Sequence, residues 1–201
     1  MPTPLTPHNI GEGKKWLIHQ EPRFGMIFEC VGQLSIPSKP QGFIGLLESI
    51  ISQQLSTKAA KTIWSRLQVA GYDTRHEILN ASDDALRALG LSRQKIRYAK
   101  ALANASVDYD GLSVLETDMV IQSLIPIVGI GEWTAQMYAL FALNHCDVFA
   151  PNDLGLQEGM RKAFDLPKRP SAQCVAVLAE PWSPWRSVAS LALWAYNDRS
   201  D

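Results

Sequence analysis

The stretch Ile127-Val128-Gly129-Ile130-Gly131-Glu132-Trp133-Thr134-Ala135 joins two segments with helical periodicity. Glycine tolerates positive φ and carries no Cβ, so Gly129 and Gly131 allow a tight turn with exposed backbone amides. At the start of the following helix, such amides and the helix dipole attract an anion such as a phosphate. A glycine-containing connection without a ligand is the alternative, and the Gly-x-Gly pattern alone favours that alternative.

Apolar residues recur at three- and four-residue spacings through most of the chain, which is typical of amphipathic helices. The expected helices cover residues 16–18, 26–32, 43–55, 58–69, 82–89, 92–103, 118–125, 132–143, 154–164, 170–179 and a last segment that Pro184 opens. The only strand-like fragment is Val148-Phe149-Ala150, which is too short to form a sheet. The sequence therefore predicts an all-α fold.

Composition limits the classes of protein to which the chain can belong. Hydrophobic residues make up 46% of the chain and charged residues 19%, as in an ordinary globular domain. No apolar run approaches the roughly 20 residues that cross a membrane. The N-terminus MPTPLTPHNI lacks both the positive start and the apolar core of a secretory signal. We therefore expect no membrane association, and a location in the cytoplasm (the nucleoid of a bacterium) or in the nucleus of a eukaryote.

Charge and cysteine content exclude further classes. The net charge of −1 argues against a protein that coats nucleic acid, although it allows contacts with a few phosphates. Basic clusters occur in residues 58–61, 93–100 and 161–169, and each is more typical of a solvated helix face than of a binding site. The cysteines are Cys30, Cys146 and Cys174. They form no CxxC pair, so we expect buried, reduced thiols, no metal and no iron–sulfur cluster.

Several stretches together change the interpretation of the glycine turn. The segment VGIGEWTA, followed by Val148-Phe149-Ala150-Pro151-Asn152-Asp153, resembles the helix-hairpin-helix and Gly/Pro-Asp loop of the DNA glycosylase superfamily. Residues 50–56 (IISQQLS) with Ala59-Ala60, and residues 184–187 (PWRS) running on to Leu193-Trp194, resemble its 3-methyladenine DNA glycosylase II branch. The resemblance covers roughly residues 43–197 with the motifs in the family's order.

The resemblance implies an architecture of two all-α subdomains that flank a cleft. Residues 41–146 are expected to form a helical barrel that carries the hairpin, and residues 147–201 a C-terminal helical subdomain that carries Asp153. Residues 1–40 are expected to pack with this C-terminal subdomain.

Asp153 is the candidate catalytic residue. An aspartate directly before a helix is also a common N-cap, and both roles can hold at once. In the family, the aspartate at this position faces the sugar of an extruded nucleotide. There a carboxylate stabilises the positive charge that develops on the anomeric carbon and orients or deprotonates the attacking water. An N3- or N7-alkylated purine leaves as a neutral base, so no general acid is needed.

Trp133 separates two mechanistic subclasses of the family. Bifunctional members, which form a Schiff base and cut the strand, have a lysine at this position because an amine is the required nucleophile. Tryptophan cannot attack, so we expect hydrolysis without lyase activity.

The aromatic residues Trp133, Trp194 and Tyr138 are the candidates for the base pocket. An indole face attracts a cationic purine by a cation–π interaction of up to about 2 kcal/mol. Trp194 matches a pocket position of the 3-methyladenine branch. For Trp133 the pocket and the core are about equally good interpretations, and Tyr138 is better suited to packing. The chain departs from the branch at Met137, where an aromatic residue is expected, and this weakens the predicted sandwich around the base.

The candidate DNA-binding residues are Gln54, Leu55, Gly129, Gly131 and Thr134. Base extrusion leaves a gap in the stack, and Gln54 or Leu55 would fill it. The alternatives are a polar helix end for Gln54 and the last core position of a helix for Leu55. Arg186 is expected to hold the terminal subdomain by hydrogen bonds rather than to touch DNA.

The sequence thus predicts a monomeric, monofunctional glycosylase that removes alkylated purines from double-stranded DNA containing damaged bases, without a cofactor or metal. One alternative is the same fold acting on deaminated or oxidised purines. Another is a non-catalytic helix-hairpin-helix protein that only binds DNA.

Overall fold

The computed structural model describes residues 2–37 and 39–199. Within these residues the regular elements are helices, and the one β-bridge is an isolated pair between Pro4 and His145. The predicted all-α fold is therefore confirmed for the described part of the chain, and residues 148–150 form no strand. No helix in these two ranges is long and apolar enough to cross a membrane.

The chain divides into two compact units. Of the described residues, 39–138 form one unit, and 2–37 together with 139–199 form the other. The chain passes from the first of these units to the second within helix α9 (Glu132–Phe141). The domain ranges and the cleft expected from the sequence stay predictions, and those ranges include residues 1, 38, 200 and 201, which lie outside the described residues.

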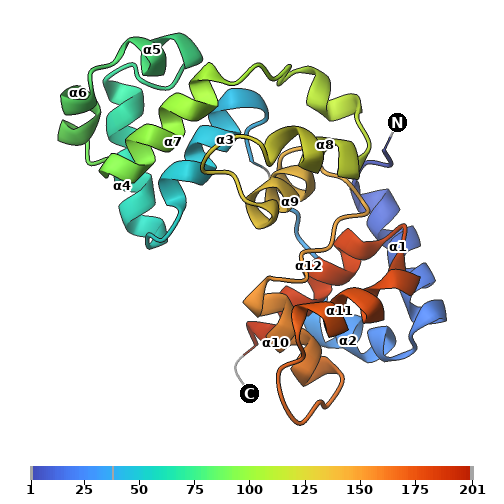
Figure 1. The fold of residues 1–201 in the computed structure, drawn as a ribbon. Coiled ribbons are helices and arrows are strands. Elements are labelled where there is room, and N and C mark those ends of the chain that lie inside the picture. Colours follow the sequence, from blue (N-terminus) through green and yellow to red (C-terminus); the bar gives the residue numbers. More distant parts are fainter. Residues whose placement is uncertain (1, 38, 200–201) are drawn as a thin grey trace. The chain divides into compact units, whose positions relative to one another are not determined.

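The unit of residues 39–138 carries the glycine turn (Figure 1). Its further elements are α3 (Gly42–Ser52), α4 (Thr57–Val69), α5 (Arg75–Asn80), α6 (Asp83–Ala88), α7 (Arg93–Asn104), the 3-10 turn η1 (Gly111–Val114) and α8 (Thr117–Leu124). Helix α7 packs against α3, α5 and α6, and α4 packs against α3. Leu46, Ile50, Leu67 and Leu102 are fully buried between these helices, so the predicted apolar faces form the core of this unit.

The other unit brings the two ends of the chain together. Its elements are α1 (Pro7–Gln20), α2 (Arg23–Val31), α10 (Leu154–Ala163), α11 (Ala172–Ala179), the 3-10 turn η2 (Glu180–Trp182) and α12 (Arg186–Asn197). Helices α1, α2 and α10 pack against α12. The ring of Phe24 meets the buried ring of Trp182 edge-on at 5.0 Å between centroids, so aromatic contacts join α2 to the C-terminal segment.

Side-chain caps explain where several helices begin. Ser56, Ser82 and Ser92 each accept a hydrogen bond from the backbone N–H three residues later and start α4, α6 and α7. Thr74 caps α5 in the same way, and this short helix was missed in the sequence, although the pair Thr74–Glu77 is a capping-box pattern.

Two proline-based helix starts were wrong. Pro170 does not open α11, because Ser171 is the N-cap and accepts from the Cys174 N–H, which leaves the proline outside the helix. Pro184 does not open α12 either; it follows a cis Ser183–Pro184 bond, and the helix starts at Arg186.

The third helix is shorter than expected. It was predicted to run to Leu55 but ends at Ser52, because Gln53 leaves the helical region with a ψ of 130° and Gln54 has a φ of 56°. Residues 53–55 therefore form an exposed turn, and the side chain of Leu55 is 38% exposed. The interpretation of Leu55 as a core residue was wrong.

Candidate functional site

Asp153 starts helix α10 as its N-cap. Its Oδ1 accepts the backbone N–H of Leu156 at 2.8 Å, and its own backbone N–H donates to the carbonyl of Ala150 at 2.9 Å. Asp153 is only partly buried. The predicted capping role is confirmed, and it fixes the carboxylate at the positive end of a helix.

Trp194 of α12 lies directly beside this carboxylate. Its indole Nε1 donates to Asp153 Oδ1 at 2.9 Å, so a single oxygen accepts two hydrogen bonds. The indole stacks on the ring of Phe141 with 5.7 Å between centroids and 29° between planes. A Cβ on Gly155 would lie 3.1 Å from Trp194 Cδ1, so the indole covers the first turn of α10. The indole of Trp194 therefore orients the Asp153 carboxylate through this hydrogen bond.

Close packing of α10 on α12 makes this contact possible. A Cβ on Gly159 would lie only 2.3 Å from the carbonyl oxygen of Leu193, so a side chain at position 159 would push the helices apart. Because Leu193 precedes Trp194, Gly159 keeps the indole within reach of Asp153.

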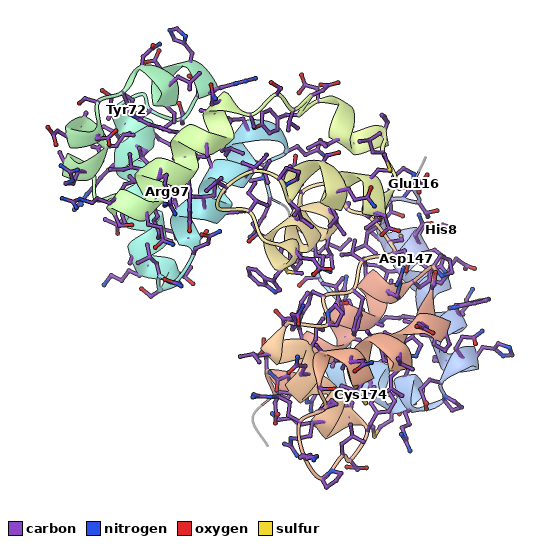
Figure 2. All side chains as sticks on the ribbon, in the orientation of Figure 1. His8, Tyr72, Arg97, Glu116, Asp147 and Cys174 are labelled. Atoms are coloured by element: carbon purple, nitrogen blue, oxygen red, sulfur yellow. The ribbon has the colours of Figure 1, made fainter. Side chains whose placement is uncertain are left out.

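The segment before Asp153 is tied to the start of α12. Ser187 Oγ accepts the N–H of Val148 at 2.9 Å and donates to the carbonyl of His145 at 2.6 Å. Asp147, labelled in Figure 2, pairs with Arg186 through Nε–Oδ1 at 2.6 Å and Nη2–Oδ2 at 2.9 Å. Burial alone would raise the pKa of Asp147, but the hydrogen bonds and charge of Arg186 hold that pKa below its usual value. The hydrogen bonds predicted for Arg186 are confirmed, and the expectation that it does not touch DNA stays a prediction.

The glycine turn lies in the other unit and packs against α7. Gly129 has a φ of 101°, and a Cβ there would lie 2.3 Å from the ring of Tyr98. The Ile130 N–H donates to the carbonyl of Ile127 at 2.9 Å and closes the turn. Gly131 meets nothing within 4 Å of its Cβ position, so the turn is tightly packed at Gly129 and open at Gly131.

Residues 53–55 are joined to this turn by a side chain. Gln53 Nε2 donates to the carbonyl of Gly129 at 2.9 Å. An open pocket of about 600 Å³ lies at this junction, and its wall includes Gln54, Leu55, Lys95, Tyr98 and residues 129–131. The candidate DNA-binding residues Gln54, Leu55, Gly129 and Gly131 therefore lie around one concave surface.

A smaller and more enclosed pocket of about 230 Å³ shares Gln53 and Gln54 with the first. Its wall also includes Lys39, Ser49, Ser52, Trp133, Thr134 and Met137. Trp133 is 45% exposed, so it is a pocket residue rather than a core residue. Thr134 and Met137, which line the same pocket, are buried.

Tyr138 has a different position from the other aromatic candidates. It is buried, and its hydroxyl accepts the backbone N–H of Gly42 at 2.8 Å, at the start of α3. Burial raises the pKa of this phenol. Tyr138 is not in the wall of either pocket described above, so it connects α9 to α3 as a packing residue.

Three residues near the candidates were missed in the sequence. Phe141 lies eight residues after Trp133 on α9, a helical spacing that could have identified it. Tyr98 gave no such signal, and Lys95 belongs to the basic cluster of residues 93–100, which was interpreted as a solvated helix face. Only the folded chain brings α7 to the glycine turn. Arg97, labelled on α7 in Figure 2, lies over the Tyr98 ring at 5.3 Å. Hydrogen bonds lower the pKa of Tyr98, the one from Gln94 most and the one from Arg97 next.

Known proteins resemble the chain in sequence. Residues 47–184 match the model of the HhH-GPD superfamily base excision DNA repair protein. DNA-3-methyladenine glycosylase 1 of Schizosaccharomyces pombe is 31% identical over 172 residues, which cover 81% of this chain and 75% of that protein.

Solved structures resemble the chain in fold. DNA-3-methyladenine glycosidase from Bacillus halodurans has a TM-score of 0.85 and 33% identity, with 92% of this chain and 89% of that chain covered. The S. pombe 3-methyladenine DNA glycosylase in complex with abasic DNA has a TM-score of 0.77 and 29% identity, with 91% of this chain and 95% of that chain covered. The expected fold class is confirmed by these similarities.

Proposed function

Because the chain belongs to the HhH-GPD superfamily of base excision DNA repair proteins, in its 3-methyladenine DNA glycosylase branch, we propose that it hydrolyses the N-glycosidic bond of alkylated purines. One observation supports this function above the others. Asp153, for which the sequence resemblance implies the catalytic role, accepts hydrogen bonds at Oδ1 from both Leu156 and Trp194. These bonds hold the carboxylate in one orientation before any substrate arrives.

Asp153 acts on the sugar in this proposal. As the bond to the base breaks, positive charge develops on the anomeric carbon, and the carboxylate stabilises it. The same carboxylate orients or deprotonates the water that completes the hydrolysis. No proton donor is needed, because an N3- or N7-alkylated purine is already cationic and leaves as a neutral base.

The enclosed pocket beside Trp133 receives the extruded base. Trp133 presents an indole to a cationic purine, and Met137 adds a polarisable thioether at a position where the branch has an aromatic residue. Thr134 and Gln53 supply polar groups for the edge of the base. The proposed pocket does not include Tyr138.

The glycine turn binds the DNA backbone in this proposal. The amides around Gly129 and Gly131 bind a phosphate at the start of α9, and Gln54 or Leu55 fills the gap that the extruded base leaves. Binding of a phosphate by backbone amides needs little positive charge on the protein, which agrees with the net charge of −1. The protein acts as a monomer on double-stranded DNA, in the bacterial cytoplasm or in a nucleus.

The decisive experiment is the release of free base from methylated duplex DNA by wild type and by Asp153→Asn. An asparagine oxygen can still accept from Leu156 and Trp194, and asparagine is a good N-cap, so this variant loses the charge and keeps the fold. We expect a loss of at least about 100-fold in single-turnover rate with retained binding to an abasic-site analogue.

Asp165→Asn is the matched control. Asp165 is exposed, it follows the same helix, and its φ of 51° is one that asparagine tolerates. It should release base at the wild-type rate. Release of no base by wild type, with binding of the analogue intact, would favour a deaminated or oxidised base as substrate. If those bases are also not released, the non-catalytic DNA-binding alternative is correct.

A further inference from the structure

The turn of residues 53–55 is strained in a way that calls for support. Gln54 has a φ of 56°, which is unfavourable for a residue with a side chain. A non-glycine residue stays in this region only where its surroundings hold it there. Leu55, the next residue, presents an apolar side chain to solvent.

Two side-chain hydrogen bonds hold the start of this turn, one from its own Gln53 and one from Lys95 of α7. Gln53 Nε2 donates to the Gly129 carbonyl at 2.9 Å, across 76 residues of sequence. Lys95 Nζ, from the first turn of α7, donates to the carbonyl of Ile51 in the last turn of α3. A lysine ammonium at this point satisfies a terminal helix carbonyl and interacts favourably with the negative end of the α3 dipole.

The side chain of Lys95 is partly buried at this contact. Burial lowers its pKa, which agrees with an ammonium group directed to the protein rather than to solvent. Its neighbours on α7 differ: Lys100 pairs with the exposed Asp83 at 2.6 Å. Lys95 is therefore distinguished from the other basic residues of this helix by the backbone group that it binds.

We propose that Lys95 and Gln53 are positioning residues that brace the Gln54–Leu55 turn between α3, α7 and the glycine turn, so that it can enter the DNA stack without yielding. This inference rests on the proposed function. A wedge separates stacked bases only if it resists displacement, and the two hydrogen bonds fix the N-terminal side of the turn to α7 and to the glycine turn. The side-chain amide of Gln53 thereby links the proposed phosphate site at Gly129 to the wedge residues Gln54 and Leu55.

Insertion of the wedge can be measured without catalysis. A duplex carries an abasic-site analogue opposite 2-aminopurine, whose fluorescence rises when it loses its stacking partners. With saturating wild-type protein we expect a clear rise, and with Leu55→Ala a much smaller one. Lys95→Met and Gln53→Met, which keep similar side-chain volume without the donor, should lower the rise to about half or less. Lys100→Met, on the same helix, should match wild type.

Catalysis supplies the second measurement. We expect Lys95→Met to lower the single-turnover rate on duplex DNA about tenfold more than the rate on the same damaged strand unpaired. In a Leu55→Ala background, Lys95→Met should have little further effect on duplex, because the brace acts through the wedge. If wild type releases no base but the fluorescence pattern holds, the proposed function fails and the brace stands.

Two results would overturn the brace. One is a normal fluorescence rise with Lys95→Met and Gln53→Met. The other is an equal loss of rate on duplex and single strand, which would mean that the substitutions only loosen the fold. Thermal unfolding of Gln54→Gly offers an independent check: glycine relieves the positive φ, so this variant should be at least as stable as wild type while its fluorescence rise is smaller.

Discussion

The indole Nε1 of Trp194 donates a 2.9 Å hydrogen bond to Oδ1 of Asp153, across 41 residues of sequence. Trp194 therefore acts on the carboxylate, whatever contact its ring makes with a base. The second bond to the same oxygen comes from the Leu156 N–H, a backbone donor that no substitution removes. Of these two donors to Oδ1, the indole of Trp194 is the one that a side-chain substitution removes.

Trp194→Phe tests this dependence, because phenylalanine keeps an aromatic ring to stack on Phe141 and lacks the N–H. A hydrogen bond to a charged group contributes about 1.5–3 kcal/mol, so the single-turnover rate of base release should fall at least about tenfold. Trp16→Phe, at an exposed position of α1, is the control and should leave the rate unchanged.

In an Asp153→Asn background, Trp194→Phe should lower the rate of base release by a much smaller factor, because the carboxylate that the indole orients is gone. An equal loss in both backgrounds would show that Trp194 acts on the base alone.

The helices could largely be predicted from the sequence, because apolar spacing and capping residues are local signals. The errors arose where a local signal was incomplete. Pro170 suits a helix start, but Ser171 beside it competes with a side-chain cap and wins. The end of α3 was missed because residues 53–55 contain no glycine or proline to mark a turn.

Candidate site residues could be predicted only where they belong to a sequence motif. Asp153, Trp133 and the two glycines stand in recognisable stretches. The bonds that organise them join distant residues: Gln53 to Gly129, and Ser187 to Val148. Side-chain spacing along the chain holds no information about such pairs. The cysteines show the same limit, since burial was expected for all three, whereas Cys174 is exposed and Cys30 is intermediate.

Thiol reactivity should follow this difference. Cys174, labelled on α11 in Figure 2, is exposed and should react first with a chromogenic disulfide reagent at pH 8. Burial raises the pKa of Cys146 to about 12, so this thiol stays protonated at that pH and should react only after unfolding. Cys174→Ser should remove the fast phase and nothing else. A fast reaction of Cys146 in the native protein would contradict the burial of the segment before Asp153.

The Asp147–Arg186 pair should make stability depend on pH. The pKa of Asp147 is lower in the folded protein, so the carboxylate stabilises the fold above the unfolded pKa of about 3.9, and this contribution is lost as pH falls through the folded value. Asp147→Asn should therefore lower the free energy of unfolding at pH 7 by about 1–3 kcal/mol, between the values for exposed and buried pairs.

The difference between wild type and Asp147→Asn should shrink when unfolding is measured below about pH 4. Glu12→Gln removes an exposed pair with Lys15 and should change the melting temperature little at either pH. A difference that persists in acid would mean that Asp147 acts through its hydrogen-bond geometry and not through its charge.

The glycine turn allows folding and DNA binding to be separated, because its two glycines have different surroundings. Gly129→Ala places a Cβ 2.3 Å from the Tyr98 ring at a φ of 101°, so it should lower stability by about 2–4 kcal/mol. For a chain of this size, that corresponds to a fall in melting temperature of roughly 4–16 °C. Gly131→Ala meets nothing within 4 Å and should melt like wild type. It should still bind an abasic-site analogue several-fold more weakly, because its Cβ points into the space that a phosphate needs. Normal binding by Gly131→Ala would place the phosphate grip elsewhere on the protein.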